Sequence, residues 1–198
     1  MKPAAIRFLL VVAMGCCAAS AQNSDFALML GGFPSVNGTV GNGYVTDSVS
    51  AGVQFNYATQ VHAFRPVGDL YLEVPLVLAV ASSSAVGPGV TSSDHVNVYF
   101  TPGVRLKFTH QRLSFYPAVG AGFASFGSFQ TVIGSGGVSI SNKGTTTGAL
   151  AVAGAMEFRA SRLLGLRLEY RDTFTRAGLG GASGHGHSLI SLGLVFHF

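Results

Sequence analysis

The sequence predicts an all-β protein: an eight-stranded antiparallel up-and-down transmembrane β-barrel that follows an N-terminal signal peptide. Three observations lead to this fold class. Mean hydropathy is +0.44 and only 10% of the residues are charged, which is apolar for a water-soluble domain. Beyond the N-terminal segment, no stretch of about twenty apolar residues could form a membrane helix. Instead, eight segments alternate between apolar and polar or small residues, which is the period of a two-faced strand.

The first 21 residues predict export. A basic start precedes the apolar run FLLVVAMGCCAA, which is too short to span a membrane as a helix. Ala19 and Ala21 form an A-x-A cleavage motif, so we expect cleavage between Ala21 and Gln22. Residues 1–21 are therefore the predicted signal peptide, and residues 22–198 are the predicted barrel domain.

Both cysteines, Cys16 and Cys17, leave with the signal peptide, so the exported chain has neither a disulfide nor thiol chemistry. Acylation of Cys16 is the alternative, although AMGC lacks the usual large aliphatic residue three positions before the cysteine. Cleavage also removes Lys2 and Arg7, which lowers the formal net charge from +4 to +2. A charge this small argues against nucleic-acid binding, which needs a clustered basic face.

Four predicted strands lie in the first half of the exported chain: residues 25–31 (DFALMLG), 48–58 (SVSAGVQFNYA), 70–78 (LYLEVPLVL) and 96–108 (VNVYFTPGVRLKF). In each of them, nearly every second residue is large and apolar, and these residues share one face of the strand. Strands of roughly ten residues with one apolar face have the length that crosses a bilayer at a tilt.

Four more strands follow: residues 113–123 (LSFYPAVGAGF), 149–158 (ALAVAGAMEF), 164–172 (LGLRLEYRD) and 188–198 (SLISLGLVFHF). The third of these alternates most sharply between large apolar and charged residues. A closed barrel of eight such strands pairs every backbone group without a helix, which is the condition for spanning a membrane.

The connections alternate in length. Short turns around RPVG, THQR and ASR separate three strand pairs, whereas four long segments rich in Gly, Ser, Thr and Asn separate the others. These long segments are GGFPSVNGTVGNGYVTD, SSSAVGPGVTSSDH, SFGSFQTVIGSGGVSISNKGTTT and TFTRAGLGGASGHGH. Short periplasmic turns and long extracellular loops are typical of outer-membrane barrels, and the segment after Phe123 has room for a hairpin extension.

The strand faces opposite the apolar ones carry a set of charged residues. An eight-stranded barrel has an interior that its own side chains fill, so charges inside it must pair. We therefore expect an ion-pair network that plugs the lumen, with glutamates paired to arginines. A small or intermittent conductance remains an alternative, but a wide pore does not. The predicted lumen residues are Glu73, Arg105, Lys107, Glu157, Arg159, Arg167, Glu169 and Arg171.

One segment, SGHGHS, carries groups that could serve a metal site or a hydrolase: His185, His187 and Ser188. No third ligand lies nearby in sequence, so we predict no metal site and no cofactor. His187 and Ser188 are neighbours, and neighbours in a strand point to opposite faces, which argues against a catalytic pair. The simpler interpretation is a solvated loop that leads into the last strand.

The signal peptide, the eight alternating segments and the final strand together resemble the small eight-stranded outer-membrane β-barrels, the OmpA/OmpX-like family of Gram-negative-type bacteria. In that family, a terminal aromatic residue with apolar residues at alternate positions before it is the signal read by the outer-membrane assembly machinery. The resemblance implies that this signal comprises Ile190, Leu192, Leu194, Phe196 and Phe198.

The resemblance implies an integral outer-membrane protein, in contact with outer-membrane lipids and lipopolysaccharide, that acts structurally or through an unidentified partner of its extracellular loops. We expect a monomer without enzymatic activity. A lipid-modifying enzyme is the alternative, because such enzymes exist among eight-stranded barrels. A soluble barrel with an apolar ligand inside is the third possibility, and the charged inner face speaks against it.

Overall fold

The computed structural model describes most of the barrel domain. The described residues are 23–33, 38–40, 43–47, 50–64, 67–86, 91–134, 137–177 and 183–198. The predicted signal peptide, with its cleavage residues Ala19, Ala21 and Gln22, lies outside them and stays a prediction. The described part of the chain contains no helix long and apolar enough to cross a membrane.

The described residues form eleven strands in one sheet. The first half of the chain supplies β1 (Ser24–Phe33), β2 (Gly38–Val40), β3 (Gly43–Asp47), β4 (Ser50–Phe64), β5 (Gly68–Val86) and β6 (Thr91–Phe100). The second half supplies β7 (Gly103–His110), β8 (Leu113–Gly134), β9 (Gly137–Arg159), β10 (Leu164–Ala177) and β11 (Ser183–His197).

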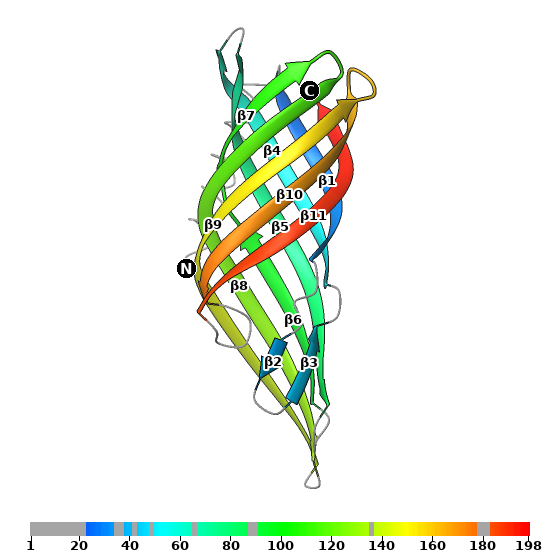
Figure 1. Ribbon diagram of the computed structural model, residues 1–198, viewed down its shortest axis with the longest axis vertical. Helices are drawn as coiled ribbons and strands as arrows, with labels where there is room; N and C mark the ends of the chain where they lie inside the picture. Colours follow the sequence, from blue (N-terminus) through cyan, green and yellow to red (C-terminus); the bar gives the residue numbers. More distant parts are fainter. Residues whose placement is uncertain are drawn as a thin grey trace, which may run out of the picture.

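The sheet closes on itself because β1 pairs antiparallel with both β4 and β11 (Figure 1). Leu28, for example, lies opposite Phe55 on one side and Leu194 on the other. Strands β6 and β7 follow each other in line between β5 and β8 and together count as one strand of the barrel wall. The closed barrel therefore has eight such wall strands. The predicted eight-stranded antiparallel barrel is therefore confirmed.

The break between β6 and β7 falls at Thr101 and Pro102, and proline explains it. Proline has no N–H to donate to a ladder, and the residue opposite Thr101 in the same register, on β5, is also a proline, Pro75. The register itself does not shift, because Phe100 lies opposite Leu76 and Gly103 lies opposite Glu73. Neither proline donates a backbone hydrogen bond, but the Pro102 carbonyl still accepts one from the N–H of Ala121 at 3.0 Å, and the wall strand keeps its direction.

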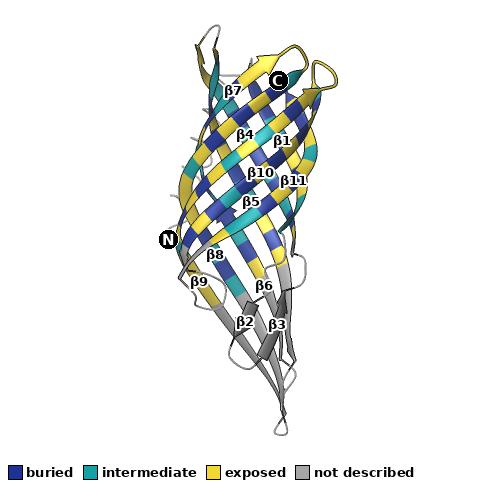
Figure 2. Cartoon of the chain, in the orientation of Figure 1, coloured by how far each residue is buried: buried dark blue, intermediate teal, exposed yellow. Residues whose placement is uncertain are grey.

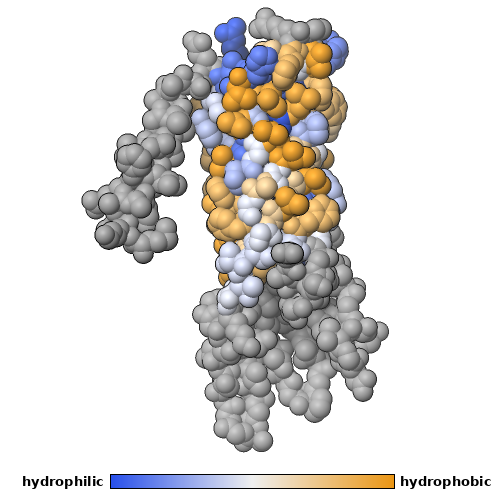
Figure 3. Space-filling view, turned by 90° about the vertical axis from the view of Figure 1, so that its left-hand side faces the viewer, coloured by the Kyte–Doolittle hydropathy of each residue, from blue (hydrophilic) through white to orange (hydrophobic). Residues whose placement is uncertain are grey.

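The predicted alternation of faces appears along every wall strand (Figure 2). On β10, Leu166 and Leu168 are 46% and 45% exposed, whereas Arg167 and Glu169 between them are fully buried. Exposed apolar residues on every wall strand form a band around the barrel. On the face that Figure 3 shows, hydrophilic residues lie at the end that bears the short turns. An exposed apolar belt of this kind matches the lipid-facing surface of a membrane barrel.

The two ends of the barrel differ. The short turns β4–β5, β7–β8 and β9–β10 and the C-terminus share one end, whereas β2, β3 and extensions of β5, β6, β8 and β9 project from the other (Figure 1). Pairing of β8 with β9 continues to Gly134 and Gly137, far beyond the belt. The long segments predicted chiefly as loops therefore contain a sheet, because their Thr, Val and Ile residues favour strands.

The β7–β8 turn places a non-glycine residue in the left-handed backbone region. His110 pairs with Leu113, which leaves Gln111 and Arg112 as a two-residue turn, and Gln111 has a φ of 56°. We predict that Gln111→Gly raises the free energy of unfolding by up to about 1 kcal/mol, because glycine relieves this strain. Urea unfolding in lipid vesicles measures the effect. Gln111→Ala is the control, and an equal gain for alanine would contradict the explanation.

The charged lumen and the projecting sheet as candidate functional sites

The barrel interior holds a layer of charged side chains that come from five wall strands. They are fixed there by the two-residue period, which turns each of them away from the lipid-facing side. None of these side chains belongs to a residue that is more than 5% exposed. The members of this layer, here called the charged layer, are Asp25, Glu73, Arg105, Lys107, Glu157, Arg167, Glu169 and Arg171.

One half of the charged layer is built around Glu157 on β9. Its Oε2 accepts a hydrogen bond from Arg167 Nη2 at 2.7 Å, and its Oε1 accepts one from Lys107 Nζ at 2.7 Å. The same Arg167 Nη2 also lies 3.3 Å from Asp25 Oδ1 on β1. Arg167 thus neutralises two carboxylates that belong to different sides of the lumen.

The other half is built around Arg171 on β10. Its Nη2 donates to Glu73 Oε1 at 2.6 Å, and its Nε donates to Glu169 Oε1 at 2.9 Å. Neutral donors complete the shell of the Glu169 carboxylate. They are Gln54 Nε2 at 2.6 Å, Asn56 Nδ2 at 3.2 Å and the Tyr116 hydroxyl at 3.2 Å. A buried carboxylate needs such partners because water is excluded from it.

Arg105 on β7 joins the two halves. It donates a hydrogen bond to Asp25, and its Nη1 lies 3.9 Å from Glu73 Oε2. Its guanidinium carbon also lies over two aromatic rings, 4.6 Å from the centroid of Tyr71 and 4.8 Å from that of Tyr116. Cation–π contacts of this kind stabilise a guanidinium that is shielded from water. The eight charged residues therefore form one connected network.

The network contains four carboxylates and four cationic side chains, so its formal charges cancel. The members of this network differ from the predicted lumen residues by one exchange: one predicted residue is absent and one further residue is present. Arg159 lies outside the network: it ends β9 at the rim, where its side chain is exposed, and none of the ion pairs among the described residues includes it. Asp25, which the predicted set lacks, takes part instead. Asp25 could have been predicted as a lumen residue, because it lies on the face of its strand that does not carry Phe26, Leu28 and Leu30.

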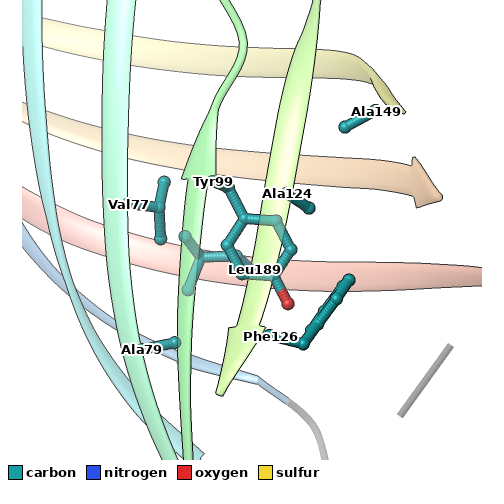
Figure 4. Packing of buried hydrophobic residues seen from close by; sticks show 7 residues of the cluster. All are labelled: Val77, Ala79, Tyr99, Ala124, Phe126, Ala149 and Leu189. Carbon is teal, nitrogen blue, oxygen red and sulfur yellow. The ribbon is translucent and has the colours of Figure 1, made fainter. Parts of the chain in front are cut away.

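A second layer of the lumen, nearer to the projecting sheet, is apolar (Figure 4). Its central ring is Tyr99, which meets Phe126 edge-on at 5.9 Å and lies 5.7 Å from the ring of His187. The buried members of this layer, here called the apolar layer, are Val77, Ala79, Tyr99, Ala124, Phe126, Ala149 and Leu189. The lumen thus holds two successive layers of buried side chains, one of paired charges and one of hydrocarbon and aromatic rings.

The histidine–serine segment does not form a catalytic pair. His187 is turned into the lumen, where its Nε2 lies 3.3 Å from Thr175 Oγ1 and its ring contacts Phe126 at 5.5 Å. Ser188 lies on the opposite face, where its hydroxyl accepts from the Tyr170 hydroxyl at 3.1 Å and donates to Asp172 at 3.4 Å. No group of three or more potential metal ligands occurs in the part of the chain that the structure describes.

The projecting sheet is the other candidate site. Its strand order is β2-β3-β5-β6-β8-β9, and its longest hairpin is β8–β9. Near the base of that hairpin, Thr146 Oγ1 donates to Ser125 Oγ at 3.2 Å on the partner strand. Beyond Ala149, the described part of β9 pairs with β8 alone, because its pairing with β10 ends at Ala149. The sheet therefore presents a broad surface and a strand edge outside the apolar belt.

Comparisons with known proteins identify the fold. No family model and no curated protein matches the sequence. Ail, the attachment invasion locus protein of Yersinia pestis, is 12% identical, with a TM-score of 0.53 over 89% of this chain and 99% of Ail. OprG, an outer-membrane protein of Pseudomonas aeruginosa, is 9% identical, with a TM-score of 0.56 over 90% and 97% of the two chains. OmpT, an outer-membrane protease of Escherichia coli, is 9% identical, with a TM-score of 0.53 over 89% and 96%.

At identities this low, the likeness concerns the fold alone. The chain has the fold of the small outer-membrane β-barrels, as the sequence resemblance implied. The neighbours include an attachment protein and a protease, so this fold by itself does not decide between a binding role and an enzymatic one.

Proposed function

We propose that this chain, a closed β-barrel with the fold of the small outer-membrane barrels, is an integral protein of the bacterial outer membrane that acts through surfaces and forms no diffusion pore. The observation that carries the proposal is the pair of buried side-chain layers inside the barrel. A barrel whose interior is filled by the charged layer and the apolar layer has no room for solute. What remains available to a partner is the projecting sheet.

The apolar belt supports the location in the membrane. Many of its outward side chains are at least 40% exposed. Leu30 is 67% exposed and Leu150 is 62% exposed. In water, a belt of this size would drive aggregation, whereas in a bilayer it contacts lipid tails. We propose that the short turns face the periplasm and the projecting sheet faces outward, where lipopolysaccharide surrounds it. The assembly machinery and a monomeric state belong to the same proposal.

The closed lumen predicts an absence of steady conductance in planar bilayers. The double variant Tyr99→Ala/Phe126→Ala removes two rings of the apolar layer and leaves the charged layer untouched. It should therefore remain as non-conducting as the parent protein, with at most brief, small openings. A steady open channel in the parent protein would refute the plugged lumen. A channel only in the double variant would assign the seal to the aromatic rings.

Two measurements test the location and the absence of enzymatic activity. Unboiled samples should migrate differently from boiled ones on gels and should fractionate with the outer membrane, because closed barrels resist detergent. Recovery from the soluble periplasm would contradict the proposal. Lipid A and phospholipids should be identical in cells with and without the protein. A change in either lipid would favour the lipid-modifying alternative.

The projecting hairpin can be removed without touching the wall. Gly127 and Gly144 lie directly opposite each other, so residues 128–143 can be replaced by an Asn-Gly turn. Cells that display the full protein should bind a component of an immobilised glycan and protein panel, and the shortened variant should lose that binding while keeping a heat-modifiable barrel. Equal binding by both proteins would place the interaction elsewhere.

A further inference from the structure

We infer that the end of the barrel with the short turns binds the headgroups of anionic phospholipids through three arginines, Arg112, Arg159 and Arg162, here called the arginine trio. The inference goes beyond the proposed function and rests on it in one respect: the orientation that brings this end to the periplasmic side. There the inner leaflet of the membrane supplies phosphate groups at the level of the turns.

The backbone brings the trio together. Arg112 lies in the β7–β8 turn and Arg159 ends β9, and the N–H of Arg159 donates to the carbonyl of Arg112 at 2.8 Å. Arg162 follows in the β9–β10 turn, which is held by Ser161. The Ser161 hydroxyl accepts from the N–H of Leu164 at 3.0 Å, and the N–H of Ser161 donates to the carbonyl of Leu164 at 2.9 Å. All three arginines are exposed.

No carboxylate in the described part of the chain pairs with the trio. Glu157 is only two residues from Arg159, but it is buried and bound to Lys107 and Arg167. Asp69 stands at the same end of the barrel and accepts a hydrogen bond from Gln60 at 2.8 Å. Three guanidinium groups are therefore left to bind an external anion.

Exposed apolar side chains border the trio. Leu163 is 68% exposed at the tip of the turn, and its carbonyl accepts a hydrogen bond from the N–H of His197, which brings Phe198, 58% exposed, close to it. Phe158, 47% exposed, pairs with Leu113 beside Arg112 and Arg159. A turn tip in water is normally polar. Apolar tips beside arginines match the boundary layer where lipid tails meet headgroups.

Phosphate is the anion that fits this site. A guanidinium offers two parallel N–H donors to phosphate oxygens, and basic clusters at a membrane surface favour anionic lipids over zwitterionic ones. The closed lumen has no net charge to offset the trio, because its four carboxylates and four cations cancel. We commit to phosphatidylglycerol and other anionic phospholipids as the ligands.

Native mass spectrometry of the full barrel, released from detergent that holds equal amounts of phosphatidylglycerol and phosphatidylcholine, tests the inference. The parent protein should retain phosphatidylglycerol in preference. The variant Arg112→Gln/Arg159→Gln/Arg162→Gln should lower that preference by at least about fivefold. The control Lys143→Gln/Arg176→Gln removes two charges on β9 and β10, away from the short turns, and should keep the parent preference. Equal preference in the trio variant would overturn the inference.

Two further readouts separate this inference from its alternatives. Heat-modifiable migration of each variant shows that the barrel is folded, so a loss of lipid cannot be blamed on unfolding. Sedimentation with insoluble peptidoglycan, an acidic polymer, is the second readout. Dependence of that sedimentation on the trio, with lipid preference unchanged, would also overturn the inference. Fractionation tests the proposed location independently, because the lipid measurement uses purified protein.

Discussion

Replacing Arg167 by methionine is expected to lower the free energy of unfolding by about 3–5 kcal/mol, which is the usual cost of breaking a buried ion pair from one side. Arg167 is fully buried and lies within 2.7 Å of a Glu157 oxygen and 3.3 Å of an Asp25 oxygen. Methionine fills part of the same volume but leaves the two carboxylates with Lys107 as the one cation that they still share. Equilibrium unfolding by urea in phosphatidylcholine vesicles, which contain no anionic lipid, measures the change.

Arg159→Met is the matched control, because it removes the same side chain from the strand that pairs with the one carrying Arg167. Arg159 is exposed at the rim and forms no ion pair with a carboxylate of the described residues, so its substitution should change the free energy of unfolding by less than about 0.5 kcal/mol. Equal effects of the two substitutions would mean that the charged layer is not the connected unit described above. A double variant, Arg167→Met/Glu157→Leu, should recover part of the loss, because it restores equal numbers of carboxylates and cations in the charged layer.

Replacing Phe198 by serine is expected to reduce the amount of protein in the outer membrane several-fold while leaving the folded barrel nearly as stable. The backbone of Phe198 closes the barrel, since its N–H donates to the carbonyl of Ser24 at 2.9 Å. A serine keeps that bond. The ring is 58% exposed at the rim, so its loss should cost about 1 kcal/mol or less in the refolded protein. A large effect in cells would therefore reflect recognition during assembly.

Leu163→Ser is the control for this effect. Leu163 is 68% exposed at the same end of the barrel but lies outside the proposed assembly signal of Ile190, Leu192, Leu194, Phe196 and Phe198. Its substitution should leave the outer-membrane level unchanged. Comparison of membrane fractions with refolding of purified protein separates the two steps. Normal outer-membrane levels of the Phe198 variant would show that the terminal aromatic residue is not read as a signal in this protein.

The membrane-facing surface could be predicted from sequence because its cause is local. A side chain in a strand points to the face opposite its neighbours, whatever the rest of the fold does. Leu166, Arg167, Leu168 and Glu169 therefore alternate between lipid and lumen in the structure as their order in the chain requires. The separation of His187 from Ser188 follows from the same rule.

The same rule could not predict whether a residue near the end of a strand is buried or exposed. Arg159 and Asp25 both have the inward parity, yet Arg159 is exposed and Asp25 is buried. The difference lies in height. Asp25 is covered by Arg105 and Arg167 from other strands, whereas Arg159 ends its strand where the wall stops. Parity states which face a residue occupies, and only the closed barrel states how deep it lies.

The sequence alone determined the eight strands, the face of each residue and the presence of charges that have to pair inside. The tertiary structure decided which of these charges meet. Arg171 binds Glu73 across the lumen although 98 residues separate them, and their strands are not neighbours in the sheet. Such contacts depend on the register of every intervening strand and on the closure of β1 against β11. The two-residue periodicity predicts neither the register nor the closure, because it is a property of each strand by itself.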